Sequence, residues 1–499
     1  MAGPTVRSRI ARQSKSYLFS NQARVALGAL VFFASGCKRE PQARDARFLA
    51  KWMEVHFALA RSERLSPLVA SRIATYGAVA LYEGMRRSAP TLRTLAGQLN
   101  GLDSLPSPDP ARSYDWPIVT ITAERTVLDT LLQEGLADTR ITIESLADSQ
   151  VKAREAEGVS PSVSAASITY GLSLAHAITK WAARDGFSRT RGLAYMPPKG
   201  RRYWVNTSTA DQYTPQSLSA ASDFVALDNP SAVLDPGAAA ERALLMNRPK
   251  ARAAKGLATI NPTRALEPYW GTLRPFALDS GDPCAPAPPA PYSEEPGSEF
   301  YQQAKAVYSK SRQLTESERQ TAFYWADTPG QTGTPAGHWL SIIGELVNQL
   351  HLSPDSAVEV YALTAVAIAD AFITCWHTKY EWNVPRPVTY IRRVIDPEWR
   401  ALIVTPPFPE YTSGHSVLSA AAAEVLSSKL GARAFTDDTQ LPLGHSPRHF
   451  QNFRAAAAEA GISRLYGGIH YPMAIENGLR QGRCVGGNVI ARLNTRKAG

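Results

Sequence analysis

The sequence predicts an all-α protein with two packed helical lobes, and three observations lead to this fold class. Apolar residues recur at three- and four-residue spacing along most of the chain from about Asp45 onward, which is typical of amphipathic helices. Runs of alternating β-branched residues are nearly absent. A proline-rich stretch, Gly281 to Gly297, divides the helical pattern in two. Its prolines exclude a helix and indicate an extended connector.

The first 37 residues are typical of a bacterial export signal. Five cations without any acid precede the apolar run Val25 to Phe33, and an Ala-Ser-Gly sequence then leads to Cys37. These small residues resemble a lipoprotein cleavage box, in which the cysteine becomes acylated. We therefore predict an exported protein that is periplasmic or anchored to a membrane only through a lipid on Cys37. An uncleaved, disordered basic tail is the alternative.

The organisation that we expect is an N-terminal helical lobe over residues 45–262, a proline-rich connector over 263–300 and a C-terminal catalytic bundle over 301–499. A chain of 499 residues is long for a single compact core, which favours two packed lobes or one large double-bundle domain. The expected helices of the two lobes span 46–62, 66–87, 116–136, 160–185, 298–312, 315–326, 335–350, 354–378, 413–430, 449–460 and 473–493.

The long apolar run Val358 to Trp376 could be mistaken for a membrane span. Because Glu359 and Asp370 lie inside it, a buried core helix is the better interpretation, and apart from the export signal we expect no spanning segment. Three cysteines follow Cys37, namely Cys284, Cys375 and Cys484. They are too few and too scattered to predict a disulfide framework, and Cys375 is expected to be a small core residue.

The formal net charge of +10 overstates the basicity of the folded part, because half of it comes from the five cations of the first 36 residues. The mild excess that remains suits an anionic substrate. No recognition motif or interleaved basic and aromatic patch indicates nucleic-acid binding, so we exclude that class of function.

Lys379 and Arg386 form the first of three motifs in the last quarter of the chain. Lys379 stands at the end of the long apolar helix, and the prolines at 385 and 387 bracket Arg386 and favour an extended backbone there. The two cations can then approach one point from different backbone segments. A guanidinium offers paired donors to the edge of an oxyanion, while an ammonium acts as a mobile point charge. Either cation alone would be interpreted as a solvated surface charge.

The second motif is Ser413-Gly414-His415, which follows a proline-rich loop and opens an alanine-rich helix. Free backbone N–H groups and the positive end of the helix dipole favour an anion at such a place. Gly414 allows a close approach of the backbone, and Ser413 can also serve as a helix cap. His415 is positioned to act as an acid or a base toward a bound oxyanion.

The third motif contains Arg464 and His470, with two glycines between them and Pro472 just after, and we expect a loop that leads into a helix. A lone histidine in such a loop usually has a structural hydrogen-bonding role. Beside the cations of the other motifs, His470 is instead expected to bond the central atom of a tetrahedral oxyanion, by covalent catalysis on phosphorus or by ligation of vanadium. Phosphate and vanadate are the two candidates.

Together the three motifs resemble the signature of the type 2 phosphatidic acid phosphatase superfamily, which includes bacterial acid phosphatases and vanadium-dependent haloperoxidases. Its pattern is lysine, six residues and Arg-Pro, then Pro-Ser-Gly-His, then Ser-Arg, five residues, histidine, three residues and aspartate. The chain matches this order and spacing with Lys379 to Arg386-Pro387, with Ser413-Gly414-His415, and with Ser463-Arg464 to His470. The resemblance implies two packed four-helix bundles with the cofactor pocket in the C-terminal one.

Further residues resemble the haloperoxidase branch. Trp376 and Phe408 match aromatic positions that line the halide side of the pocket in chloroperoxidase-like members. Asp327, in the segment Tyr324 to Gly330, would be the carboxylate that pairs with Arg464. Helical bundles of this kind often form pairs, so a homodimer is expected as well.

Two positions depart from the family pattern. Thr412 stands where proline is usual, which is minor because the donors follow it. Ala474 stands where the family has the aspartate that orients the histidine, and loss of such a carboxylate typically weakens a site about 10–100-fold. Glu476 is on a different helical face and is a poor substitute. A backbone carbonyl or another carboxylate would have to take over the role.

The resemblance implies a vanadium-dependent haloperoxidase that oxidises halide with hydrogen peroxide to hypohalous acid through a peroxovanadate anchored by His470. His415 would assist proton transfer, Lys379 would polarise the bound oxygen, and a small organic acceptor would be halogenated. The residues that would hold vanadate are Lys379, Arg386, Ser413, Gly414, Arg464 and His470.

Two other functions remain open. In an exported acid phosphatase, His470 would attack the phosphorus of a phosphomonoester and His415 would protonate the leaving alcohol. In a non-catalytic lipoprotein, which the alanine at 474 favours, the same site would only bind an oxyanion.

Overall fold

The computed structural model describes residues 45–207, 265–279 and 283–497, and these belong to one compact unit. The predicted export signal with its acylated Cys37 lies outside the described residues. So does most of the stretch between 186 and 260, where the sequence loses its helical periodicity and predicts loops. The first elements include the four helices that the sequence predicted in this part of the chain and three that it did not. They are α1 (Arg47–Ser62), α2 (Pro67–Met85), the short η1 (Arg86–Ser88), α3 (Trp116–Leu131), α4 (Ala137–Ala156), α5 (Pro161–Ala182) and α6 (Phe187–Thr190).

Local sequence explains where these helices begin. The side chains of Ser66, Asp115 and Ser160 each accept a hydrogen bond from the backbone N–H three residues on, and a proline follows within the first turn. Helix α4 was not predicted. It buries only a narrow face, Thr139, Ile143, Ala147 and Arg154, so its apolar periodicity is weak.

The remaining elements form the second half of the fold. They are η3 (Trp270–Thr272), α10 (Glu299–Ser311), α11 (Glu316–Tyr324), α12 (Thr334–Gln349), α13 (Pro354–Trp382), α14 (Pro387–Val394), α15 (Gly414–Leu430), β1 (Phe435–Asp437), η4 (Leu441–Leu443), β2 (Arg448–Phe450), α16 (Phe453–Tyr466) and α17 (Pro472–Arg492). The two strands pair antiparallel, with Phe435 opposite Phe450. The all-α prediction is confirmed.

Two expectations about the second half were wrong. The short helix α14 follows Arg386 directly, in a stretch where we predicted no helix, because Pro387 suits the first helical position. Helix α16 continues to Tyr466 rather than ending near residue 460. Gly461 lies within the helix and does not end it, so Arg464 lies in the last turn of a helix and not in a loop.

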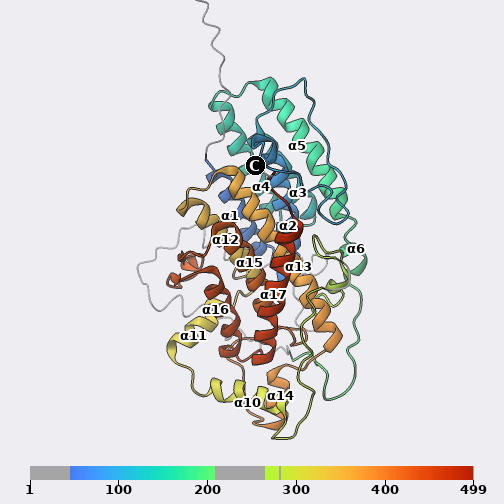
Figure 1. The fold of residues 1–499 in the computed structure, drawn as a ribbon, viewed down its shortest axis with the longest axis vertical. Helices are drawn as coiled ribbons and strands as arrows, with labels where there is room; N and C mark the ends of the chain where they lie inside the picture. The colour runs from blue at the N-terminus through green and yellow to red at the C-terminus, as the bar shows by residue number, and fades with distance from the viewer. Residues whose placement is uncertain (1–44, 208–264, 280–282, 498–499) are drawn as a thin grey trace, which may run out of the picture. The chain divides into compact units, whose positions relative to one another are not determined.

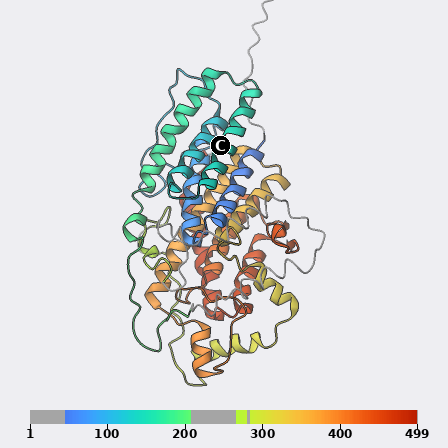
Figure 2. The same ribbon diagram turned by 180° about the vertical axis from the view of Figure 1, so that it is seen from behind.

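Helix α13 is central to the core. It packs against α2 on one side and against α15 and α17 on another, while α1 packs against α12. Figures 1 and 2 both show α3, α4 and α5 gathered at one end of this unit, with α10 and α14 at the opposite end. One continuous core extends from Leu49 in α1 through Val366 in α13 to Val489 in α17. The boundaries at 262 and 300 between two lobes stay a prediction.

The apolar segment in α13 is a core helix, as the acidic residues inside it indicated. Among the described residues, the stretch Pro354–Val394 alone has the length and hydropathy of a membrane span, and its most apolar window is fully buried inside the protein. Asp370 lies within it and accepts hydrogen bonds from the backbone N–H groups of Phe276, Ala277 and Leu278. A buried carboxylate is thereby satisfied by main-chain donors.

The cysteines require a correction, because Cys284 and Cys484 form a disulfide. Cys284 lies in the proline-rich connector, which is not helical over 283–297, and Cys484 lies in α17. Their separation of 200 residues carries no pairing signal in the sequence, and only the folding of the connector against α17 brings them together. Cys375 is buried in α13 and remains a thiol, as expected.

Helices α15 and α17 approach each other through a row of glycines in α17, at 478, 482 and 486. A Cβ on Gly482 would lie 2.0 Å from the carbonyl oxygen of Val417, and one on Gly486 would lie 2.7 Å from that of Ala421. Only glycine allows this distance. The close approach holds the start of α15, with Ser413 and His415, against the start of α17, which follows His470.

We expect Gly482→Ala to lower the free energy of unfolding by about 1–3 kcal/mol, because the added methyl group forces the two helices apart. Gly487→Ala is the matched control in the same helix, since nothing lies within 4 Å of a Cβ there. It should leave stability unchanged or raise it by about 0.5–1 kcal/mol. Urea unfolding of both variants checks the expectation, and an unchanged midpoint for Gly482→Ala would contradict the close packing.

Candidate active site

Lys379 is buried in the last turn of α13, with its ammonium group held entirely by main-chain oxygens. Its Nζ donates to the carbonyls of Pro409 (3.1 Å), Glu410 (3.0 Å) and Thr412. Burial lowers the pKa of Lys379 to about 7, and the charge of Arg386 acts in the same direction. Carbonyl oxygens satisfy the three N–H donors without cancelling the charge, so the ammonium form is a source of positive potential, and with this pKa it is the main form only below about pH 7.

Arg386 has the extended backbone that its flanking prolines indicated, with φ −67° and ψ 154°, and it caps α14. Its Nε donates to the carbonyl of Phe408 (2.9 Å) and its Nη1 to that of Ile469 (2.9 Å). Nη1 also lies 3.1 Å from Nε2 of His470. The remaining nitrogen, Nη2, is buried and has no hydrogen-bond partner among the described residues.

His470 lies in the loop before α17, as predicted, with both ring nitrogens in contact with protein groups. Nδ1 is 2.8 Å from Oε1 of Glu410, and Nε2 faces Arg386. Burial lowers the pKa of His470 well below its usual value, and the charges of Arg386 and Lys379 add to the effect. The imidazole is therefore neutral at ordinary pH and can offer one nitrogen lone pair.

Ser413 is the N-cap of α15, since its Oγ accepts a hydrogen bond from the N–H of Ser416. The first-turn N–H groups of Gly414 and His415 have no acceptor within the helix and are available to an anion. Gly414 lies over the aromatic ring of Trp376, whose nearest carbon is 3.7 Å from the position of a Cβ. The motif therefore lies at the start of a helix, as predicted, and its role toward an anion stays a prediction.

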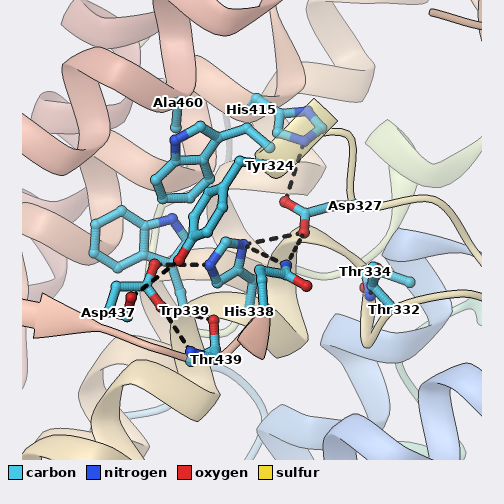
Figure 3. A network of polar contacts seen from close by, with 12 residues as sticks. Tyr324, Asp327, Thr332, Thr334, His338, Trp339, His415, Asp437, Thr439 and Ala460 are labelled. Carbon is cyan, nitrogen blue, oxygen red and sulfur yellow. Dashed lines mark hydrogen bonds and ion pairs between the residues drawn. The ribbon is translucent and has the colours of Figure 1, made fainter. Parts of the chain in front are cut away.

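His415 is 15% exposed and contacts a chain of buried charges. Its Nε2 lies 3.5 Å from Oδ2 of Asp327, and the other oxygen of Asp327 lies 3.0 Å from Nδ1 of His338. Nε2 of His338 lies 2.9 Å from Asp437. Figure 3 shows His338 between the two carboxylates, with His415 on the other side of Asp327.

His415 and His338, the two histidines that contact Asp327, differ in charge at neutral pH. Burial and the charge of Arg464 lower the pKa of His415 to about 4, although Asp327 opposes the shift. Burial alone would lower the pKa of His338, but Asp327 and Asp437 outweigh it and raise that pKa to about 10. His338 is therefore a buried cation at neutral pH, and His415 is neutral until it takes up a proton.

Arg464 requires a second correction. The sequence-based interpretation paired it with Asp327, but this carboxylate contacts His338, His415 and Gln440 instead. Arg464 donates from Nη1 to the carbonyl of Trp325, and its Nε is buried without a partner among the described residues. Burial lowers the pKa of Arg464 to about 10, an effect that Asp327 opposes by its charge. Arg464 and Asp327 interact electrostatically without direct contact, because the carboxylate oxygens of Asp327 face His338 and His415 instead.

Trp376 and Phe408 form an aromatic wall beside the cations. Their rings are 4.8 Å apart, and Nζ of Lys379 lies 5.6 Å and 5.1 Å from the respective ring centres. The guanidinium of Arg386 lies 4.7 Å from the ring of Phe408. Trp376 is buried and Phe408 is partly exposed, so the wall reaches from the cations toward solvent.

The donor set fits an oxyanion such as vanadate or phosphate. Two buried donor nitrogens from separate segments, Nη2 of Arg386 and Nε of Arg464, have no hydrogen-bond partner in the described part of the chain. Leaving a buried polar group unsatisfied costs about 1–3 kcal/mol, and more for a charged group. An anion with several oxygens would satisfy these groups and balance the positive charge that the carbonyls leave in place.

Comparison with known proteins identifies the family. A family model described as the VCPO second helical-bundle domain matches residues 359–498. The crystal structure described as that of the first bacterial vanadium-dependent iodoperoxidase is 33% identical, covers 92% of this chain and 99% of its own, and has a TM-score of 0.76. The chain belongs to the vanadium-dependent haloperoxidase family. This confirms the resemblance inferred from the three motifs.

Two other haloperoxidase structures agree in fold alone. The holo and apo forms of a bacterial vanadium-dependent chloroperoxidase are each 14% identical to this chain. They cover 91% and 90% of it, and 98% of their own chains, with TM-scores of 0.61 and 0.58. No curated protein matches the sequence.

Thr412 and Ala474, the two residues that depart from the haloperoxidase family pattern, both make contacts within the site. Thr412 donates through Oγ1 to Gln481 (2.7 Å), while its carbonyl holds Lys379. Ala474 is buried and its carbonyl accepts the N–H of Ser413 (3.0 Å). Glu476 is exposed, as expected for a different helical face.

Sequence reasoning missed three charged groups of the site: Glu410, His338 and Asp437. Glu410 could have been noticed, since it is the acidic residue three positions before Ser413, within a recognised motif. The contacts of His338 with Asp327, 11 residues before it, and with Asp437, 99 residues after it, appear only in three dimensions.

Replacement of His338 by glutamine tests the buried cation. The folded-state pKa of about 10 lies above the unfolded value near 6.5, so its stabilising contribution is complete below about pH 6.5 and is lost as the pH rises through 10. The difference in unfolding free energy between wild type and His338→Gln should shrink by up to about 1.4 kcal/mol per pH unit in that window. Urea unfolding of both proteins between pH 6 and pH 10 measures it, and a difference independent of pH would contradict the assignment.

Proposed function

We propose that this protein is a vanadium-dependent haloperoxidase that binds vanadate and uses hydrogen peroxide to oxidise a halide to hypohalous acid, which then halogenates a small organic acceptor. The observation that carries the proposal is the set of buried, unpartnered donors around the neutral imidazole of His470. Membership of the haloperoxidase family, at 33% identity over nearly the whole of a solved iodoperoxidase, supports the same chemistry.

Bound vanadate would supply a Lewis-acid centre at which peroxide becomes electrophilic toward halide. The protein's part is to hold this group, and His470 offers the nitrogen lone pair at Nε2 for it. Arg386 and Arg464 donate from Nη2 and Nε, and the first-turn N–H groups of α15 complete the set of donors.

Lys379 acts mainly through its charge. All three of its N–H bonds are directed to the carbonyls of residues 409, 410 and 412, so direct contact with a bound oxygen requires that one of these hydrogen bonds be exchanged. Its positive charge at the same time stabilises negative charge that develops on oxygen. The predicted polarising role of Lys379 is thus part of the proposal in this form.

His415 is suited to proton transfer. It is neutral, has a side chain that reaches solvent, and lies beside the ionised Asp327, which stabilises the imidazolium formed when a proton is taken from hydrogen peroxide. His338 holds Asp327 in place and keeps it ionised. The aromatic wall of Trp376 and Phe408, beside the ammonium of Lys379, is a weakly hydrated place for a halide to approach.

We further propose that the protein is exported, with a lipid on Cys37 as its membrane anchor, and that it forms a homodimer. The Cys284–Cys484 disulfide supports export, because disulfides persist in oxidising compartments.

Halogenation of a phenolic dye tests the function. With vanadate, hydrogen peroxide and either iodide or bromide, the wild type should turn over the dye, and vanadate-free protein and His470→Ala should not. Iodide, the more easily oxidised of the two, is the more sensitive probe. Hydrolysis of an aryl phosphate is assayed on the same sample.

Protein that binds vanadate but halogenates nothing would contradict the proposal. If that protein hydrolyses the aryl phosphate through His470, it is an acid phosphatase. If it does neither, it is a non-catalytic oxyanion-binding protein.

A further inference from the structure

The carboxylate that holds the imidazole of His470 comes from an unexpected place. The helix that follows His470 carries Ala474 where the family pattern has an aspartate, and Ala474 is fully buried. Oε1 of Glu410, in the loop before α15, instead lies 2.8 Å from Nδ1 of His470. The same oxygen accepts the backbone N–H of Tyr471 at 2.8 Å. Glu410 is itself fully buried.

The backbone around Glu410 is fixed on both sides. Its N–H donates to the carbonyl of Val384 (3.0 Å), and its own carbonyl accepts a hydrogen bond from Lys379. Three residues later, the N–H of Ser413 donates to the carbonyl of Ala474 in the first turn of α17. Two hydrogen bonds therefore join the loop to the start of α17, one from Ser413 to Ala474 and one from Tyr471 to Glu410. The carboxylate of Glu410 has little freedom to leave His470.

The contacts of His470 determine which of its nitrogens carries the proton. A guanidinium can only donate hydrogen bonds, so Nε2, 3.1 Å from Nη1 of Arg386, is the acceptor. In a neutral imidazole the other nitrogen, Nδ1, then carries the hydrogen and donates it to Glu410. Two partners on opposite sides of the ring thus favour the same tautomer, in which the lone pair of Nε2 faces the cationic side of the site.

We propose that Glu410 is the positioning residue for His470, and that it supplies from the loop before α15 the carboxylate contact that the family pattern places on the following helix. It fixes the orientation and tautomer of the ring and raises the basicity of Nε2, as carboxylate partners of ligating histidines do. Glu410 itself touches no substrate. This inference rests on the proposed function, because the ligand of Nε2 is taken to be vanadate.

The competing interpretation is that Glu410 serves only as a counter-ion to Arg386 and Lys379. The two roles differ in what they require of the side chain. A positioning role requires a hydrogen-bond acceptor at Oε1, which glutamine also provides, whereas a counter-ion role requires the negative charge. Glu410→Gln and Glu410→Ala therefore separate the two interpretations.

The test measures vanadate affinity by isothermal titration calorimetry on the full chain. Glu410→Ala should weaken binding about 10–100-fold, and Glu410→Gln clearly less, because the amide oxygen still accepts from Nδ1 and from Tyr471. The control pair is Glu124→Ala and Glu124→Gln. Glu124 forms the same kind of buried contact with His56, at 2.7 Å, in the N-terminal helices, and its loss should leave vanadate affinity unchanged.

A second measurement does not depend on vanadium. In histidine-labelled protein without vanadate, proton NMR should show a downfield, slowly exchanging Nδ1–H resonance of His470 in the wild type. This resonance should persist with a shifted position in Glu410→Gln and be absent in Glu410→Ala. If Glu410 did not contact His470, its replacement would leave the Nδ1–H resonance of His470 unchanged.

The outcomes are distinguishable. Wild-type protein that binds no vanadate contradicts the proposed function, and the NMR experiment still tests the Glu410 contact. Wild type that binds vanadate, together with Glu410→Ala that binds it within about twofold of the wild type or retains the Nδ1–H resonance, overturns the positioning role. A Glu410→Gln variant as weak as Glu410→Ala assigns the residue to the counter-ion role instead.

Discussion

The site depends on the burial of three cations whose hydrogen bonds go mainly to carbonyl oxygens rather than to carboxylates. Lys379 donates to three backbone carbonyls, Arg386 to two, and Arg464 to that of Trp325. A carbonyl satisfies an N–H donor but leaves the positive charge in place. The protein therefore keeps a concentrated positive potential in a low-dielectric interior, where an anion is bound most strongly.

The acidic residues around the site are committed to histidines and not to these cations. Asp327 and Asp437 hold His338 as a buried imidazolium, and Asp327 also faces His415. Glu410 contacts His470 and the N–H of Tyr471. Because of this division, each imidazole has a different role. In the function that we propose, His470 offers a lone pair and His415 exchanges a proton, while His338 stabilises Asp327, the carboxylate between itself and His415. The glycine row of α17 makes the arrangement compact, because it brings the starts of α15 and α17 together.

Much of this was predictable from sequence because it depends on local spacing. The interval from Lys379 to Arg386, the Ser-Gly-His turn and the interval from Arg464 to His470 fixed which side chains converge, and the prolines around Arg386 fixed its backbone. Most helices followed from apolar periodicity. Helix α4 did not, since its buried face is narrow, and α14 did not, since it is only eight residues long.

Sequence reasoning missed which side chains contact each other, because these contacts form only in the tertiary structure. No sequence pattern predicts that Asp327 contacts two histidines instead of Arg464. None predicts that Cys284 pairs with Cys484, which is 200 residues away in the chain. The replacement of one orienting carboxylate by another is of the same kind. Ala474 showed that the aspartate was missing, but the residue that contacts His470 lies 60 positions earlier in the chain.

A crystal structure of the protein with bound vanadate is the most direct test. We expect a bond from Nε2 of His470 to vanadium, with Nη2 of Arg386 and Nε of Arg464 within hydrogen-bond distance of the vanadate oxygens. Vanadate bound elsewhere, or these two nitrogens still without an acceptor when the site is filled, would contradict this expectation.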